Sequence, residues 1–455
     1  MIERVEKRLT GWGNLSPALC DVATPHEEHE VQQLLLQDGE KTTWIARGLG
    51  RSYGDSSINR GAGVVEHTGL WRIRSFDPAS GIIDCQAGVS IAQIAAAAVP
   101  RGRFLPVTPG TQFVTIGGAI AADVHGKNHH VDGSLARHVV DFRLLTATGE
   151  MLTCGPDQNQ DVFWATVGGM GLTGMILSAR IRLAPIETAF VVVDDEKTRD
   201  LDETLSRLDE TAADYKYSIA WIDCLAAAGR LGRSVLMQAN PAEVDHLPAV
   251  RRTSPLSMPR VRCQSLPFYL PSFTLNRFSV GALNRAFYAL HPVGRRVVDL
   301  ARYFYPLDSL RHWNRMYGRR GFVQYQAVLP PEASRRAMIQ LLEHMRRSRI
   351  GSFFAGLKSS GPASGGLLSF MRCGHTIAFD LPYRRHLPRL LHELDQIVLS
   401  HGGRLYLAKD AMMRPETFAA MYPRLEAFRR IQRHLDPRGI LSSSQARRLR
   451  IVEPA

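Results

Sequence analysis

The chain lacks any long hydrophobic segment. Nowhere in its 455 residues do about 18 apolar side chains follow one another, the length that a bilayer-spanning helix needs, so we expect no transmembrane helix. The first eight residues, Met1–Arg8, carry charges but no apolar run after them, which argues against a secretory signal peptide. The sequence therefore predicts a protein that is cytoplasmic or peripheral on the inner membrane.

Cysteine and acidic residues are also scarce. The six cysteines stand singly, without a C-x-x-C pair, which disfavours a disulfide framework or a zinc site and favours a reducing compartment. His129 and His130 are adjacent, but neighbouring side chains on a strand point to opposite faces, so we expect no metal. Asp and Glu number 43 against 56 Lys and Arg, a net charge of +13. Because the patterns of nucleic-acid-binding modules are absent, we expect no nucleic-acid partner.

Glycine is concentrated in two segments, residues 45–55 and 109–128. They read Ile-Ala-Arg-Gly-Leu-Gly-Arg-Ser-Tyr-Gly-Asp and Pro-Gly-Thr-Gln-Phe-Val-Thr-Ile-Gly-Gly-Ala-Ile-Ala-Ala-Asp-Val-His-Gly-Lys-Asn. Glycine has no Cβ and permits positive φ, so successive N–H groups can converge on phosphate oxygens. The hydroxyl and basic side chains among the glycines suit a large, flat, anionic cofactor. Together the two segments predict a binding site for flavin adenine dinucleotide (FAD).

A third glycine pattern, Gly169–Gly174, matches G-x-G-x-x-G. In a Rossmann fold this motif follows a strand and opens a helix. Here a helical pattern precedes it and the alternating segment 175–183 follows it. We therefore interpret it as a glycine turn beneath the cofactor.

The length predicts two domains. From about Val31 to Pro185, short β-rich runs alternate with helical patterns and predict a mixed α+β domain. Strands are expected at 43–47, 63–66, 81–86, 139–146 and 173–183, and helices at 90–99 and 161–167.

A second α+β unit begins near Glu187. Strands are expected at 189–194, 217–223, 322–329, 353–357 and 375–381, and helices at 197–214, 331–346 and 385–401. Residues 402–409 predict a further glycine-rich strand, which a basic helical tail follows. We divide the chain into an FAD-binding domain at 1–186, a substrate domain at 187–401 and a C-terminal segment at 402–455 that returns to the FAD domain.

The composition changes between about residues 240 and 305, where prolines and aromatic residues are frequent. From Arg251 to Tyr303 the one acid is Asp299, against nine arginines: Arg251, Arg252, Arg260, Arg262, Arg277, Arg285, Arg295, Arg296 and Arg302. We expect a long loop without regular structure. Arginine mixed with aromatic residues suits contact with anionic lipid headgroups, and an ordinary surface loop is the alternative.

Six further segments are distinctive: Leu9–Gly13, His125–His130, Tyr217–Cys224, Trp313–Gly318, Gln324–Gln326 and Gly402–Asp410. With the two glycine-rich segments they make the chain resemble the flavin oxidases of the vanillyl-alcohol oxidase type. Within that superfamily it resembles the decaprenylphosphoryl-β-D-ribose 2′-oxidases, over nearly its whole length. The resemblance implies an α+β fold in which a two-part FAD-binding domain holds an inserted α+β substrate domain.

The resemblance also implies which residues contact FAD. They are Arg47, Gly48, Leu49, Gly50, Arg51, Ser52, Tyr53, Gly54, Gly110, Thr111, Thr115, Ile116, Gly117, Gly118, Ala122, His125, Gly171, Ile176 and Tyr406. Related sugar-lactone oxidases commonly attach FAD covalently to a histidine in the first glycine loop, where this chain has Arg51. We therefore expect non-covalent FAD.

By the same resemblance, Lys409, Lys358, Gln326 and His125 surround the hydroxyl that is oxidised. The implied reaction takes a polyprenylphosphoryl-β-D-ribose to its 2′-keto form by hydride transfer to the flavin. It is the first half of the epimerisation that makes the arabinose donor for cell-wall arabinan. A partner reductase of the short-chain type would return hydride from NADH. From the residues alone, Lys409 also fits a solvated charge at the end of a strand.

The strand expected at 375–381 departs from the mycobacterial members, which carry Trp, Asn and Cys where this chain has His375, Thr376 and Ala378. Hydride transfer needs no thiol, but the other two changes bear on the exact sugar or lipid. A soluble sugar-lactone or alditol oxidase is one alternative. A membrane-peripheral flavoprotein without turnover is another, which the presence of Lys358, Gln326 and Lys409 together disfavours.

Overall fold

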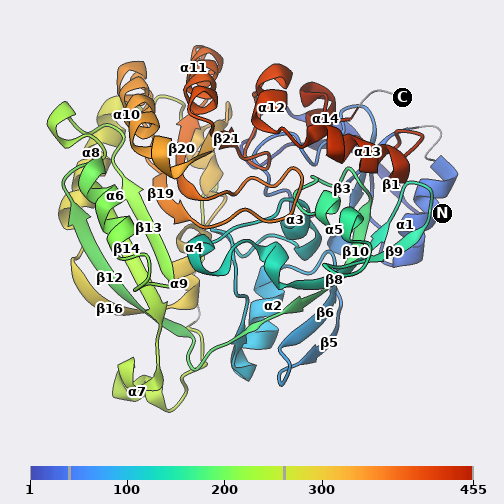
Figure 1. The fold of residues 1–455 in the computed structure, drawn as a ribbon, viewed down its shortest axis with the longest axis horizontal. Helices are drawn as coiled ribbons and strands as arrows, with labels where there is room; N and C mark the ends of the chain where they lie inside the picture. Colours follow the sequence, from blue (N-terminus) through green and yellow to red (C-terminus); the bar gives the residue numbers. More distant parts are fainter. Residues whose placement is uncertain (1, 39–41, 260–262, 453–455) are drawn as a thin grey trace.

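The computed structural model describes residues 2–38, 42–259 and 263–452. Three sheets dominate it: a four-stranded and a five-stranded sheet on the right of Figure 1, and an eight-stranded sheet on the left. Helices and strands are mixed throughout, which confirms the predicted α+β class. No helix within the described ranges is both long enough and apolar enough to cross a membrane.

The four-stranded sheet has the order β1-β2-β4-β3. Its strands are β1 (Arg4–Leu9), β2 (Ala18–Ala23), β3 (Trp44–Arg47) and β4 (Gly63–Glu66). The short parallel strands β3 and β4 are buried, with Ile45 and Val64 inaccessible to solvent. The first glycine-rich loop leaves the end of β3, so this sheet holds the start of the loop in place.

The five-stranded sheet has the order β5-β6-β10-β8-β9 and is antiparallel. Its strands are β5 (Ile73–Asp77), β6 (Ile82–Gln86), β8 (Val139–Leu145), β9 (Met151–Cys154) and β10 (Met175–Arg182). Helix α2 (Ile91–Ala98) begins with a capping box formed by Ser90 and Gln93. Helix α5 (Gln160–Thr166) precedes Gly169–Gly174 and β10 follows it, which confirms that this motif is not a Rossmann turn.

The eight-stranded sheet, β16-β12-β14-β13-β19-β20-β18-β21, is antiparallel throughout. Its strands are β12 (Phe190–Thr198), β13 (Tyr217–Ile222), β14 (Ser234–Pro241), β16 (Gly294–Asp299), β18 (Phe322–Leu329), β19 (Ala355–Ser360), β20 (Gly374–Pro382) and β21 (Arg404–Leu405). Helices α6 (Leu201–Glu210), α10 (Pro331–Ser348) and α11 (Leu387–Ser400) cover one face. Ile377 and Phe379 are buried in that core, so the alternate residues of β20 face the other way.

Three expectations about local structure are wrong. The strand expected at 189–194 continues to Thr198, and α6 begins only after Asp200, whose side chain accepts a hydrogen bond from the Glu203 N–H. The charged residues up to Lys197 gave the start of the expected helix a helical pattern. Residues 191–198 nevertheless pair with β14 and therefore form a strand. Only Arg404–Leu405 of the strand expected at 402–409 pairs with β18. His129 and His130 lie in the short helix α4 (His129–Asp132), not on a strand.

The segment 240–305 is not the unstructured loop that the sequence indicated. It contains the fourteen-residue helix α8 (Arg277–Leu290), the edge strand β16 and the short helices α7 (Ala249–Arg252) and α9 (Leu300–Phe304). Helix α8 is capped by Asn276 and packs Phe287 against Trp221, with 4.6 Å between ring centroids. Of the nine arginines, Arg260 and Arg262 lie outside the described residues.

The C-terminal segment reaches both parts of the molecule. After β21 it forms α12 (Pro415–Met421), α13 (Leu425–Leu435) and α14 (Ser444–Leu449), above the right-hand sheets of Figure 1. Leu441 bridges to Trp44 of β3. Arg448 donates to Asp55 at 2.7 Å and to Asp410 at 2.8 Å. The division into domains at 186 and 401 stays a prediction.

Candidate active site

The two glycine-rich loops and the open face of the eight-stranded sheet enclose one cavity of about 320 Å³. All four predicted catalytic residues line it: Lys409, Lys358, Gln326 and His125. So do the predicted cofactor contacts other than Gly54 and Ile116. Ile116 is buried in the core. Gly54 instead permits close packing, because a Cβ there would lie 1.9 Å from the Asp410 carbonyl oxygen.

The glycines of the first loop are required by its packing. A Cβ on Gly48 would lie 2.1 Å from Thr115 Oγ1, and Gly50 has a φ of +64°. Thr115 in turn caps helix α3 (Ile116–Ala121) by accepting from the Gly118 N–H. The two loops therefore interlock, and a side chain at Gly48 would separate them.

The N–H groups of residues 49–52 form no hydrogen bond to any residue that the structure describes. Four successive free donors in a turn suit a diphosphate. The Arg47 guanidinium, by contrast, is engaged within the protein: it donates to Thr10 O at 2.9 Å and to Ser57 Oγ at 3.1 Å. The donor set and the glycine cradle thus fit the diphosphate of FAD, and the contact of Arg47 with FAD stays a prediction.

The buried end of the cavity holds two lysines. Lys409 follows β21, and its Nζ lies 4.0 Å from the centroid of the Tyr53 ring. Burial lowers the pKa of Lys409 to about 7, with the Asp380 carboxylate raising it and the Lys358 charge lowering it further. Burial also lowers the pKa of Lys358, on β19, to about 8. Both amines therefore have a substantial neutral fraction near neutral pH.

His125 and Gln326 form a hydrogen-bonded pair beside the lysines. The Gln326 amide donates to His125 Nε2 at 3.0 Å. Burial, reinforced by the charges of Lys358 and Lys409, holds the pKa of His125 well below its ordinary value. The Tyr406 ring lies 5.1 Å from the imidazole, and its hydroxyl donates to the Ala122 carbonyl at 2.8 Å. His125 is therefore a fixed, neutral imidazole.

Asp380 is a buried acid that interacts with the charge of Lys409, and the sequence did not reveal it. It is buried on β20 and accepts from Gln324 Nε2 at 2.6 Å and from the Tyr317 hydroxyl at 3.4 Å. Burial raises its pKa to about 7, against the opposing effects of Gln324 and the Lys409 charge. Alternation along a strand places Thr376, Ala378 and Asp380 on one face of β20. This pattern is the sequence signal that could have placed Asp380 on the same face as Ala378.

The departures from the mycobacterial pattern fall on both faces of β20. Ala378 lies opposite Gln326 and lines the cavity. Thr376 pairs with Lys358. His375 is on the other face and contacts Asp209 at 3.1 Å, so it takes no part in the cavity.

Comparison with known proteins agrees with this geometry. The family model described as FAD binding domain matches residues 21–155, and the model for D-arabinono-1,4-lactone oxidase matches residues 378–449. Decaprenylphosphoryl-beta-D-ribose oxidase of Mycolicibacterium smegmatis is 41% identical over 98% of each chain. L-gulonolactone oxidase of Bos taurus is 26% identical over 91% of this chain and 92% of its own. These similarities confirm the resemblance, and the cofactor is FAD.

The first of these relatives matches the whole chain, and the two glycine loops, the free loop N–H groups and the lysine-rich end of the cavity fit the same chemistry. The chain therefore belongs to the decaprenylphosphoryl-β-D-ribose oxidase family of FAD-dependent oxidoreductases.

Proposed function

We propose that the protein oxidises the 2′ hydroxyl of a polyprenylphosphoryl-β-D-ribose to the 2′-keto sugar. One observation carries the proposal: Lys409, Lys358, Gln326 and His125 come from four separate segments and line the cavity that the FAD-binding loops enclose. The similarity to decaprenylphosphoryl-beta-D-ribose oxidase of Mycolicibacterium smegmatis supports the substrate class.

FAD is held, in this proposal, by the free N–H groups of residues 49–52 around its diphosphate. Gly117, Gly118 and Gly171 leave room for its remaining length along the cavity. When bound, FAD supplies the acceptor for the hydride that leaves the carbinol carbon. The protein has to orient the sugar and accept the hydroxyl proton.

Lys409 is the residue suited to accept that proton. A general base works best when its pKa lies near the working pH, and burial places the pKa of Lys409 at about 7. His125 cannot take this role readily, because the same burial keeps it neutral and weakly basic. Gln326 and His125 instead offer fixed polar groups that orient the sugar hydroxyls.

A soluble sugar-lactone oxidase is the second candidate, favoured by the match of residues 378–449 to the lactone oxidase model. The test is anaerobic flavin reduction by a short-chain prenylphosphoryl ribose, compared with L-gulonolactone and free ribose at equal concentration. Rapid bleaching by the prenylphosphoryl sugar alone supports the proposal. Bleaching by the lactone alone would replace it with the second candidate.

We further propose that the 2′-keto product passes to an NADH-dependent short-chain reductase. A ketone becomes the epimeric alcohol only if hydride is returned, and such a reductase would supply that hydride from NADH. NADH consumption should require this protein, the sugar substrate and the reductase together. Consumption without the reductase would contradict the proposal.

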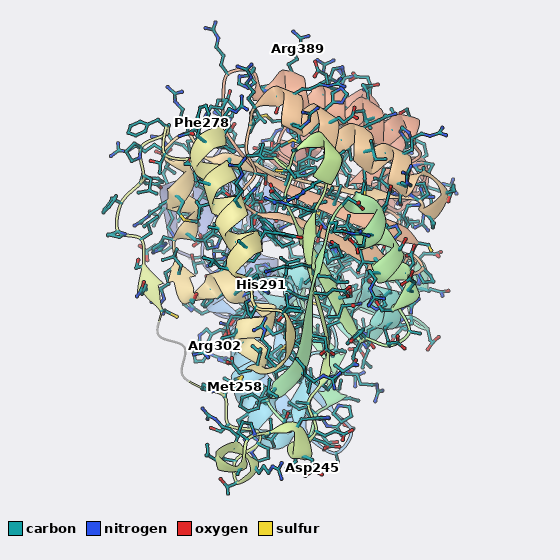
Figure 2. All side chains as sticks on the ribbon, turned by 90° about the vertical axis from the view of Figure 1, so that its left-hand side faces the viewer. Asp245, Met258, Phe278, His291, Arg302 and Arg389 are labelled. Carbon is teal, nitrogen blue, oxygen red and sulfur yellow. The ribbon has the colours of Figure 1, made fainter. Side chains whose placement is uncertain are left out.

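Peripheral contact with a membrane is proposed for the face that carries α8, which faces the viewer in Figure 2. Of the fifteen large apolar side chains that are exposed among the described residues, nine lie between Val250 and Val297. Phe278 and Leu290, at the two ends of α8, are 77% and 81% exposed.

The charge on this face is smaller than the sequence indicated. Arg295 and Arg296 pair with Asp194 and Asp195 of β12, and Arg302 pairs with Asp299. Arg277 and Arg285 on α8 are exposed and form no salt bridge with any residue that the structure describes. Each contributes about 1 kcal/mol near an anionic surface, so attachment should be weak and reversible. Flotation with anionic vesicles at low salt should recover the protein, and Phe278→Ser should reduce recovery. Equal recovery with neutral vesicles would contradict an electrostatic contribution.

A further inference from the structure

The Arg51 guanidinium is a cation without a partner in the cavity wall. Its Cζ lies 4.0 Å from the centroid of a Trp12 ring and 5.3 Å from that of Phe113. It forms no hydrogen bond or salt bridge with any residue in the described part of the chain, and its Nε is buried without a partner. Stacking on aromatic rings holds the guanidinium plane while leaving its N–H donors free.

The acid whose charge acts on Arg51 is Asp308, which raises the pKa of the guanidinium against the lowering by burial. Asp308 accepts hydrogen bonds from Thr111 Oγ1 at 2.7 Å and from the Gln112 N–H at 2.8 Å. Its carboxylate is therefore already bound, and no salt bridge joins it to Arg51. A half-buried cation with free planar donors is a site for an anion, phosphate above all.

Apolar side chains border this cation within the same cavity. Trp12, Trp313 and Leu307 line it, and the two tryptophan rings meet edge to face with 5.8 Å between centroids. None of these three was expected from the sequence as a site residue. A phosphate joined to a hydrocarbon chain would pair its charge with Arg51 and pack its chain against the apolar side chains. A free sugar or lactone has neither the negative charge nor the hydrocarbon chain.

Arg51 also lies near the reaction site. Its charge opposes the rise that burial causes in the pKa of Tyr53, and the Tyr53 ring centroid lies 4.0 Å from Lys409 Nζ, so Tyr53 lies near both the cation and the amine. In a 1-phosphoryl pentose, the phosphate and the 2′ hydroxyl are on neighbouring carbons. A sugar whose 2′ hydroxyl meets Lys409 therefore carries its phosphate close to Arg51.

We propose that the Arg51 side chain binds the phosphodiester of the prenylphosphoryl sugar, with Trp12, Trp313 and Leu307 receiving the first isoprene units. The inference rests on the proposed function and identifies the residue by which the substrate class is recognised. The backbone N–H of Arg51 remains with residues 49–52 for the cofactor, so the loop serves both ligands through different groups.

The test distinguishes binding of the substrate phosphate by Arg51 from binding of the FAD diphosphate by Arg51. FAD-loaded wild type, Arg51→Gln and Arg51→Lys are titrated with farnesyl phosphate and with farnesol, following the flavin absorbance. FAD affinity is measured separately by reconstituting the apoprotein. Arg311→Gln, which removes an exposed arginine that does not line the cavity, is the matched control.

Wild type should bind farnesyl phosphate more tightly than farnesol. Arg51→Gln should weaken farnesyl phosphate binding by about tenfold to a hundredfold, the usual value of a hydrogen bond to a charged group. Arg51→Lys should lose less, and Arg311→Gln should match wild type. FAD affinity should be unchanged in all three variants.

Two results would overturn the inference. In one, Arg51→Gln weakens FAD binding and leaves farnesyl phosphate binding unaffected, which assigns the side chain to the cofactor diphosphate. In the other, wild type does not distinguish farnesyl phosphate from farnesol. If farnesyl phosphate binds through Arg51 but farnesylphosphoryl ribose does not reduce the flavin, the proposed function fails and the phosphate site stands.

Discussion

Removal of the Lys409 amine should abolish substrate oxidation while leaving the cofactor bound. At pH 7 about half of the Lys409 side chains are neutral, because their pKa is about 7, against about one in three thousand at the ordinary lysine pKa of 10.5. The cavity thus raises the concentration of the basic form by about three orders of magnitude. A positioned general base contributes about 10²–10⁴ in rate, so Lys409→Ala should slow flavin reduction at least a hundredfold, or about 2.7 kcal/mol.

The assay is anaerobic stopped-flow bleaching of the flavin by a short-chain prenylphosphoryl ribose between pH 5.5 and 9. In wild type the rate should rise with pH and level off above about 7, because only the deprotonated amine accepts the hydroxyl proton. Lys409→Ala should be slow at every pH and lack this rise. Lys409→Arg is the control that keeps the charge and cannot lose its proton in this range, so it should be equally slow.

FAD content of each variant, measured after gel filtration, separates a catalytic loss from loss of the cofactor. Full FAD content with a hundredfold slower reduction is the expected result. A variant that reduces its flavin at a rate near that of wild type, or that keeps the same pH profile, would refute the role assigned to Lys409.

Three further results are expected. Asp380→Asn removes the negative charge that raises the pKa of Lys409, so the rising limb of the pH profile should move to lower pH; an unchanged midpoint would show that the two groups are not coupled. The flavin should be released by acid precipitation, because Arg51 is too weak a nucleophile for a covalent bond, and colour in the pellet would contradict this. Ala378→Cys places a thiol in the cavity wall, so alkylation at this position, checked by intact mass, should block flavin reduction in the variant and not in wild type. An uninhibited alkylated variant would mean that position 378 does not face the substrate.

The sequence predicted the parts of the fold that local patterns determine. The strands around Gly63–Glu66 and Tyr217–Ile222 were expected within a residue of their ends, since short apolar runs specify them. The glycine loops were recognisable as a cofactor site because their composition has few other uses. The prediction of an unstructured loop at 240–305 was wrong for a non-local reason. Strand β16 is ordered by pairing with β12, whose acids also neutralise Arg295 and Arg296.

The chemistry of the cavity depended on tertiary structure in the same way. Lys409 looks like a solvated lysine at a strand end, and only its burial against Tyr53 and near Asp380 shifts its pKa. Asp380 had no motif to mark it, and Trp12 lay in a distinctive segment without an expected role, because their partners come from distant segments. Arg51 was assigned to the cofactor from its loop, and that assignment stays a prediction; the position of its side chain against Trp12 and Phe113 could not be read from the sequence.

The C-terminal segment has a consequence for how the holoenzyme is made. Tyr406 and Lys409 form one wall of the cavity, Leu441 pairs with Trp44, and Arg448 ties Asp55 to Asp410. The loop at 47–55 therefore gains these supports only after residues 406–448 have been synthesised and folded. Domains generally fold in order from the N-terminus during synthesis, but this loop depends on contacts with residues much later in the chain. We expect a chain truncated before about residue 440 to bind FAD poorly, because it lacks Leu441 and Arg448.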